Sequence, residues 1–277
     1  MTQSALLEQI KSKKSFLCIG LDVDQDLIPL DLKCEQDALF IFCKRIIEVT
    51  APYCVAYKPN IAFFEAHGLS GWESLEKIIN YLNSEYPEVF TIADAKRGDI
   101  GNTSNMYAKA FFQNLEFDSI TISPYMGKDS VEPFLSFDNK YVFLLTLTSN
   151  SGSEDFQLKE ISDSSNKLYE EVILKSKEWK NSHNIMYVVG AKNVKEISRI
   201  RKLVPNSYLL IPGVGAQGGS LKDICENGLD NGLKLLVNSS RSIIYSSSGE
   251  DYAEKAMLAA AKLQEEMEKY IIDKGII

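Results

Sequence analysis

The sequence predicts a closed (β/α)8 barrel that occupies residues 1–277 as a single domain. Two observations predict it. Eight short apolar segments rich in β-branched and aromatic residues recur along the chain, and longer stretches with helical periodicity separate them. Near-continuous apolar strands are typical of parallel sheets that are covered on both faces. The number and length of these strands favour a closed barrel over an open doubly wound sheet.

The expected elements follow one another without a break in composition that would mark a linker. The strands are expected at 16–22, 54–58, 89–94, 119–123, 142–148, 185–190, 207–212 and 234–238. The clearest helices are expected at 35–49, 72–84, 104–114, 160–180, 193–202 and 251–270, and several open with Asn, Ser or Asp as N-caps. The first strand is not followed by GxGxxG, because Gly20 precedes Leu21 and Asp22, so a dinucleotide site is not supported.

Composition narrows the classes of partner. The net charge of -8 argues against a broad basic surface that would bind nucleic acid or anionic lipid. We therefore expect small molecules or protein as partners. Five cysteines without a CxxC pair predict neither disulfides nor a zinc site and fit a reducing cytoplasm. Two histidines argue against a metal site, and no apolar run is long enough to cross a bilayer. We therefore expect a cytoplasmic protein without a metal site.

Charged or polar residues, and one glycine, lie at or just after the carboxyl ends of the predicted strands, where parallel barrels have their catalytic residues. These residues are Asp22, Lys58, Asp94, Lys96, Ser149, Gly213 and Arg241. For Asp22 or Lys58 taken alone, an ordinary surface residue at a strand end is an equally good interpretation.

The segment DAKRGDIGNT is harder to explain as an ordinary surface turn. If it is extended, Asp94 and Lys96 project to the same side of the strand, and Gly98 permits a turn that brings Asp99 near. Alternating charges so close together stabilise one another and keep the lysine protonated. The structural alternative is an ion-pair network at a helix entry, with Asp99 or Asn102 as the cap.

A glycine-rich segment after the seventh strand is a candidate phosphate site. Residues 212–219 read PGVGAQGG and offer backbone N–H groups from Gly213 onward, the Gln217 amide and a following helix N-terminus. Arg241 supplies a positive charge. In isolation, such a loop is as often only a tight connection between two elements.

Taken together, these motifs resemble the orotidine 5'-phosphate decarboxylase family along almost the whole chain, and its larger bacterial branch (type 2) in particular. The motifs that carry the resemblance are GLD at 20–22, YKPN at 57–60, DAKRGDIGNT at 94–103, SPYMG at 123–127, PGVGAQGG at 212–219 and SSRSIIY at 239–245. The resemblance implies a cofactor-independent carboxy-lyase that makes UMP from orotidine 5'-phosphate in the last step of de novo pyrimidine synthesis.

The resemblance also implies roles for residues at matching positions. Lys96 would protonate C6, Asp94 would lie beside the departing carboxylate, and Lys58 would link the acids to the ribose. The implied substrate contacts are Asp22 to the ribose, Ser149 to the pyrimidine amide, and Gly213, Gln217 and Arg241 to the phosphate. Asp99 and Thr103 would reach the active site of the neighbouring subunit in a homodimer with shared sites.

Two other functions remain open at this point. A related sugar-phosphate barrel enzyme, either an aldolase or a metal-assisted decarboxylase, would reuse the phosphate loop. A Schiff-base aldolase needs a neutral lysine, whereas the acids around Lys96 favour its charged form. From another class, the chain could be a catalytically inactive barrel that still binds a nucleotide.

Overall fold

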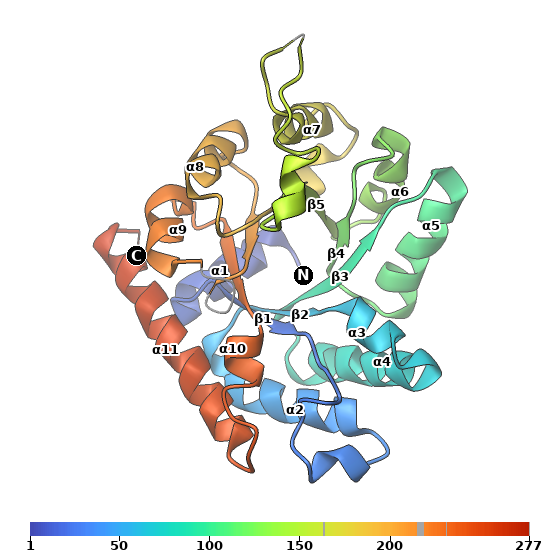
Figure 1. Ribbon diagram of the computed structural model, residues 1–277, viewed down its shortest axis with the longest axis vertical. Coiled ribbons are helices and arrows are strands. Elements are labelled where there is room, and N and C mark those ends of the chain that lie inside the picture. The colour runs from blue at the N-terminus through green and yellow to red at the C-terminus, as the bar shows by residue number, and fades with distance from the viewer. Residues whose placement is uncertain (163, 215–218, 231, 277) are drawn as a thin grey trace. The chain divides into compact units, whose positions relative to one another are not determined.

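A closed barrel of eight parallel strands forms the centre of the fold, and the strand order follows the chain from first to last (Figure 1). The computed structural model describes residues 1–162, 164–214, 219–230 and 232–276. The strands are β1 (Leu17–Leu21), β2 (Ala56–Pro59), β3 (Phe90–Arg97), β4 (Ser119–Ile122), β5 (Tyr141–Leu147), β6 (Ile185–Val189), β7 (Leu209–Pro212) and β8 (Leu235–Ser239). Each strand overlaps its predicted range, so the predicted (β/α)8 fold is confirmed.

The burial of the strands explains why their sequences are almost continuously apolar. Every residue of β1, β2, β4, β6 and β8 is buried, which means that both faces of each strand are covered. Strand β3 is buried through Ala93, and its last residues, among them Asp94 and Lys96, emerge from the packed interior. The polar residues of β3 therefore mark the point where the strand leaves the core.

Helices alternate with the strands. They are α1 (Gln3–Lys13), α2 (Ala38–Thr50), α3 (Ile61–Glu65), α4 (Gly68–Glu85), α5 (Gly101–Lys109), α6 (Glu132–Leu135), α7 (Leu168–Ser176), α8 (Val194–Leu203), α9 (Leu221–Gly228), α10 (Arg241–Ile244) and α11 (Tyr252–Asp273). The predicted helix at 104–114 comprises most of α5 and a π-helical turn at Ala110–Asn114.

The predicted helix at 160–180 is wrong in its extent, because α7 begins only at Leu168 and ends at Ser176. The residues before it form a short antiparallel bridge between Glu160 and Lys167. The Glu170 carboxylate then accepts a hydrogen bond from the Lys167 backbone N–H at 2.9 Å, which stabilises the first turn. A local hydrogen bond thus decides where the helix begins.

The residues group into two compact units. The first contains Met1–Ala95, Leu115–Phe117 and Asn238–Ile277, and the second contains Lys96–Asn114 and Asp118–Val237. In the first unit, the Phe42 ring of α2 stacks between Tyr245 and Tyr252, with ring centroids 5.8 and 5.3 Å apart.

In the second unit, the buried Arg201 guanidinium of α8 donates hydrogen bonds to backbone carbonyls of four residues. These acceptors are Val204, Ser207, Gly228 and Lys234. One side chain therefore ties α8 to the segments around α9 and to the approach to β8. Across the part of the chain that the structure describes, no helix combines the length and the apolar composition that a membrane crossing requires.

Candidate functional site

Three charged side chains of the first unit meet at the carboxyl ends of neighbouring strands. Asp22 directly follows β1, Lys58 lies in β2, and Asp94 lies near the end of β3. Lys58 Nζ donates a hydrogen bond to Asp94 Oδ2 at 2.6 Å and lies 4.0 Å from Asp22 Oδ1. The in-register pairing of β1 with β2 and a bridge between Asn60 and Asp94 bring these side chains together.

This ammonium group is buried between two carboxylates. The Lys58 side chain is 5% exposed, against 21% for Asp22 and 11% for Asp94. Burial alone lowers the pKa of Lys58, but the charges of Asp94 and Asp22 and the Asp94 hydrogen bond outweigh burial and raise this pKa above its ordinary value. Lys58 is therefore a cation at every physiological pH. The interpretation of Lys58 as an ordinary surface residue at a strand end is wrong.

Asp22 has one carboxylate oxygen that the protein leaves without a hydrogen bond. Its Oδ1 is buried and accepts no hydrogen bond from the described residues. Tyr245 holds the backbone of this segment, because its hydroxyl accepts from the Asp24 N–H at 2.6 Å and lies 3.4 Å from the Asp22 carbonyl. The sequence indicated Tyr245 only as part of a motif. Asp22 Oδ1 is thus an acceptor that can receive a hydroxyl donor from a ligand.

Arg241 is the first residue of α10, two positions after β8 ends. Arg241 is an exposed residue. The turn before it packs closely on β1, where Ser240 donates to the Gly20 carbonyl at 2.9 Å and a Cβ on Gly20 would meet Ser240 Cβ at 2.8 Å. Glycine at position 20 is therefore required for the position of the turn that carries Arg241.

In the second unit, Lys96 has an unusual backbone conformation. Its φ is 48°, in the left-handed region that side chains other than glycine rarely adopt, and its N–H donates to Thr121 Oγ1 at 2.9 Å. Strand β3 continues to Arg97, but the backbone of Lys96 itself is not extended, so the condition for Asp94 and Lys96 to project to the same side is not met. Left-handed residues in strands cost free energy and cluster at functional sites.

The turn after Lys96 differs from the expected one. Gly98 is needed for space, because a Cβ there would lie 2.9 Å from the Ser123 carbonyl oxygen. Asp99 Oδ1 accepts from the Ile100 N–H at 2.7 Å, and the Asp99 N–H donates to Ser104 Oγ at 3.0 Å. Helix α5 begins at Gly101, and its N-cap is Ile100 rather than either of the capping residues considered from the sequence.

The remaining candidate residues of the second unit lie at strand or helix ends. Thr103 is exposed in the first turn of α5, and Ser149 is half-buried two residues after β5. Gly213 follows β7 with φ 100°, and its carbonyl accepts from the Gly219 N–H at 3.1 Å. Gly213 and Gly219, two glycines of the motif, therefore lie next to each other beyond the end of β7. Gln217 lies outside the described residues.

Two thiols of the first unit lie in or next to its strands. Cys18 and Cys54 are fully buried, and burial raises the pKa of both, that of Cys54 to about 11. Neither thiol is a thiolate near neutral pH, so a nucleophilic role is not supported.

Polar and charged side chains at the carboxyl ends of strands in a closed parallel barrel define the class of (β/α)8-barrel enzymes. The sequence then specifies the family. Residues 15–256 match the model of the Orotidine 5'-phosphate decarboxylase / HUMPS family. The chain belongs to this family.

Individual relatives agree with this assignment. The chain is 57% identical over 274 residues to the orotidine 5'-phosphate decarboxylase of Flavobacterium johnsoniae, an alignment that covers 99% of this chain and 100% of the relative. It is 58% identical over 267 residues to that of Christiangramia forsetii, covering 96% and 97%. The solved structure of Leishmania donovani OMP decarboxylase superposes with a TM-score of 0.84 at 37% identity, covering 98% of this chain and 100% of that one.

Proposed function

We propose that this protein decarboxylates orotidine 5'-phosphate to UMP and CO2, the last step of de novo pyrimidine synthesis. The observation that carries the proposal is the buried ammonium group of Lys58 between Asp22 and Asp94 in a member of this family. Asp94 lies two residues before Lys96 in the chain. Holding charged groups out of water costs free energy, and clusters of such groups occur most often at functional sites.

The chemistry explains why a lysine is needed. Loss of CO2 from C6 of the pyrimidine ring leaves an sp2 carbanion that no neighbouring π system can delocalise. An enzyme without a cofactor must supply a positive charge and a proton at that atom. In our proposal Lys96 supplies both and delivers its proton to C6. The left-handed backbone of Lys96 supports this role, because strain of this kind persists where a side chain must be aimed.

The acids of the first unit have complementary roles in the proposal. Asp94 lies beside the carboxylate that departs, and Lys58 links Asp94 to the ribose. Asp22 accepts a ribose hydroxyl, which is supported by its buried and unsatisfied Oδ1. This oxygen has an ionic neighbour, Lys58 Nζ at 4.0 Å, but no hydrogen bond among the described residues, and a ribose hydroxyl would supply one.

Phosphate and base are recognised by separate segments in the proposal. Gly213, Gln217 and Arg241 bind the phosphate, and Ser149 binds the pyrimidine amide. The hydrogen bond between the Gly219 N–H and the Gly213 carbonyl supports the phosphate contact, because it holds two glycines of the motif together at the carboxyl end of the barrel, next to the start of α9.

We include a homodimer with shared active sites, in which Asp99 and Thr103 reach the partner's substrate. Two apolar side chains near Thr103, Ile100 and Met106, are 57% and 48% exposed and are suited to burial against a second copy. A cytoplasmic location is part of the proposal and is supported by five free cysteines.

The raised pKa of Lys58 argues against a Schiff-base aldolase that would use this residue, because imine formation requires a neutral amine. Borohydride added with a sugar-phosphate substrate should therefore trap no adduct on Lys58.

The test is the loss of orotidine 5'-phosphate absorbance when purified protein is added in the presence of EDTA. We expect rapid loss with the wild type and none with Lys96→Ala, which should still bind UMP. The variant also excludes a contaminating decarboxylase from the expression host. An active Lys96→Ala, or a folded wild type that binds UMP without turnover, would overturn the proposal.

A second measurement tests the phosphate contact. Arg241→Ala should weaken UMP binding by roughly 10- to 100-fold, the range expected for a hydrogen bond to a charged group, and leave uridine binding unchanged. Equal affinity of wild type and variant for UMP would contradict this assignment.

A further inference from the structure

Two amide side chains hold the backbone of Thr148, the residue that precedes Ser149. The Thr148 N–H donates to Gln157 Oε1 at 2.7 Å, and Gln157 Nε2 donates to Thr148 Oγ1 at 3.0 Å. On the other side, Asn193 Nδ2 donates to the Thr148 carbonyl oxygen at 3.1 Å. That carbonyl belongs to the peptide bond that joins Thr148 to Ser149, whereas the Thr148 N–H belongs to the peptide bond before it, so side chains hold both peptide groups that flank Thr148.

Gly190, the residue that follows β6, packs against the backbone of Ser149. A Cβ on Gly190 would lie 2.6 Å from the Ser149 nitrogen and 2.8 Å from its Cα, so only glycine allows this approach. The Gly190 N–H donates to the Leu147 carbonyl at 2.7 Å, and the Gly190 carbonyl accepts from the Asn193 N–H at 3.1 Å. Asn193 is therefore itself bonded to Gly190, the residue that packs against Ser149.

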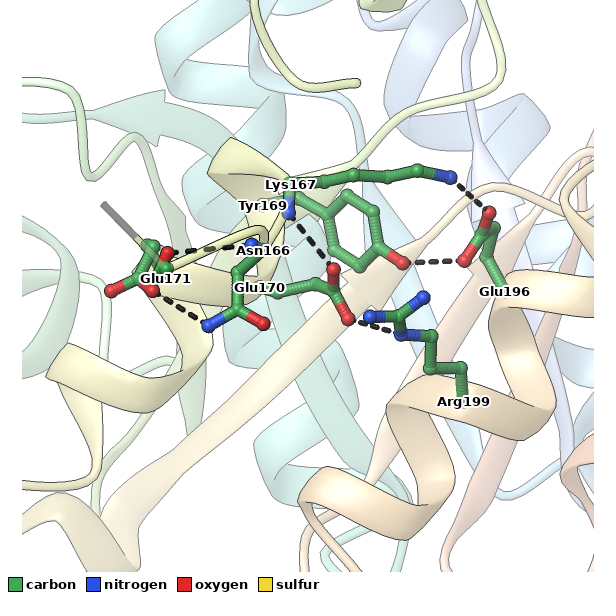
Figure 2. Close-up of polar contacts among 8 residues, drawn as sticks. Asn166, Lys167, Tyr169, Glu170, Glu171, Glu196 and Arg199 are labelled. Atoms are coloured by element: carbon green, nitrogen blue, oxygen red, sulfur yellow. Dashed lines mark hydrogen bonds and ion pairs between the residues drawn. The ribbon is translucent and has the colours of Figure 1, made fainter. Parts of the chain in front are cut away.

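The starts of α7 and α8 fix the two amide residues in turn. Gln157 is held through its carbonyl, which accepts from the Tyr169 N–H at 3.1 Å. The Tyr169 hydroxyl donates to Glu196 Oε2 at 2.5 Å, and Lys167 Nζ donates to Glu196 Oε1 at 2.6 Å (Figure 2). Asn193 is the N-cap residue of the same helix that carries Glu196.

A second ion pair joins the same two helices, because Glu170 in the first turn of α7 pairs with Arg199 of α8 (Figure 2). Glu170 is buried, and Arg199 is half exposed. The frame that supports Gln157 and Asn193 is thus made of two helix starts that are tied to each other by charged hydrogen bonds.

We propose that Gln157 and Asn193 are positioning residues that hold Ser149 in the orientation from which it binds the pyrimidine ring. This inference rests on the proposed function, because it takes Ser149 as the base contact. A hydroxyl in a polar loop can point in many directions, whereas a ring amide offers its donor and acceptor in one plane. Fixing the two peptide groups that flank Thr148 limits that freedom before the ligand arrives.

Substitutions that change an amide to an acid test this geometry with nearly unchanged shape. In Gln157→Glu the carboxylate still accepts from the Thr148 N–H, and its second oxygen accepts from the Thr148 hydroxyl once that hydroxyl turns away from Asn150 Oδ1, so the backbone contact survives. In Asn193→Asp an oxygen replaces the nitrogen that faces the Thr148 carbonyl, so a donor becomes an acceptor and the contact becomes repulsive. The two variants introduce the same charge and are expected to behave in opposite ways.

The experiment measures the Kd of UMP and of ribose 5-phosphate for each variant by calorimetry, together with kcat and KM for orotidine 5'-phosphate. Asn193→Asp and Gln157→Ala should weaken UMP binding by roughly three- to tenfold, the effect of one hydrogen bond, with ribose 5-phosphate within about twofold of the wild type. Gln157→Glu should bind both ligands as the wild type does. Asn166→Ala, which removes an amide bonded at 2.7 Å to Glu171 in the same region, is the control and should leave both affinities unchanged.

Equal losses for UMP and ribose 5-phosphate in the two weakened variants would show general damage to the loop and overturn the inference. So would a wild-type UMP affinity in folded Asn193→Asp. If that variant fails to fold, Gln157→Ala against Gln157→Glu decides the question alone. Failure of the proposed function is seen separately, as a wild type that does not decarboxylate or that binds UMP no better than ribose 5-phosphate.

Discussion

Replacement of Lys58 by methionine should destabilise the protein strongly, because it leaves two carboxylates at the strand ends without their cation. Lys58 Nζ lies 2.6 Å from Asp94 Oδ2 and 4.0 Å from Asp22 Oδ1. At an effective dielectric constant of about 20, those distances correspond to attractions of about 6 and about 4 kcal/mol. The cost of removing all three groups from water opposes them, so we expect a net loss of about 3–5 kcal/mol, as for other buried pairs that lose one partner.

The assay is urea unfolding followed by circular dichroism at pH 5, 7 and 9. The folded-state pKa of Lys58 is raised, so its contribution is complete below its unfolded pKa of about 10.4 and is lost only as the pH rises through the folded value. The deficit of Lys58→Met should therefore be the same at pH 7 and 9. At pH 5 Lys58 is also fully charged, so the deficit should be no larger than at pH 7.

Lys77→Met is the matched control. Lys77 Nζ lies 2.8 Å from Asp37, but the two side chains are 44% and 42% exposed. Water and salt screen this pair, so its loss should cost no more than about 1 kcal/mol. A deficit of Lys58→Met no larger than that of Lys77→Met, or one that grows on acidification, would refute the reasoning.

Three further outcomes are expected. Lys96→Gly and Lys96→Ala should both be inactive. In urea the glycine variant should be as stable as the alanine variant or up to about 1 kcal/mol more stable, because φ 48° strains any residue with a Cβ. A clearly more stable alanine variant would contradict the strain. Gly98→Ala should lower stability by about 1–3 kcal/mol in the same assay, because its Cβ would lie 2.9 Å from the Ser123 carbonyl, and an unchanged midpoint would argue against that contact. In thiol labelling of the folded protein, exposed Cys34 should react first and the four buried cysteines only after denaturation; rapid labelling of more than one thiol would show that the core opens.

The positions of the strands could be predicted because burial on both faces leaves little choice of residue. A strand such as β6, buried along its whole length, must be apolar throughout, and that run is visible in the sequence. The extent of α7 could not be predicted in the same way. Residues 160–167 have a composition that a helix tolerates, and the helix starts where Glu170 receives the Lys167 N–H. That choice depends on one side chain whose orientation no periodicity encodes.

The candidate site shows the same division. The order of charges in DAKRGD and the glycines after β7 are local features, so the sequence alone indicated Lys96 and Gly213. No motif or spacing pointed to Gln157 or Asn193, because each is an ordinary amide in a polar segment. They matter only because folding brings 148, 157 and 193 together.

The sequence by itself therefore determined the (β/α)8 fold, the family and the residue types of the chemistry, since these follow from local pattern and motif. Only the tertiary structure decided the environment of Lys58, which the sequence left as an even choice between a surface residue and a site residue. Its two carboxylate neighbours are far away in the sequence: Asp22 lies 36 residues before Lys58, and Asp94 lies 36 residues after it. Electrostatic free energy depends on distance through space and on exclusion of water, and both are properties of the folded chain.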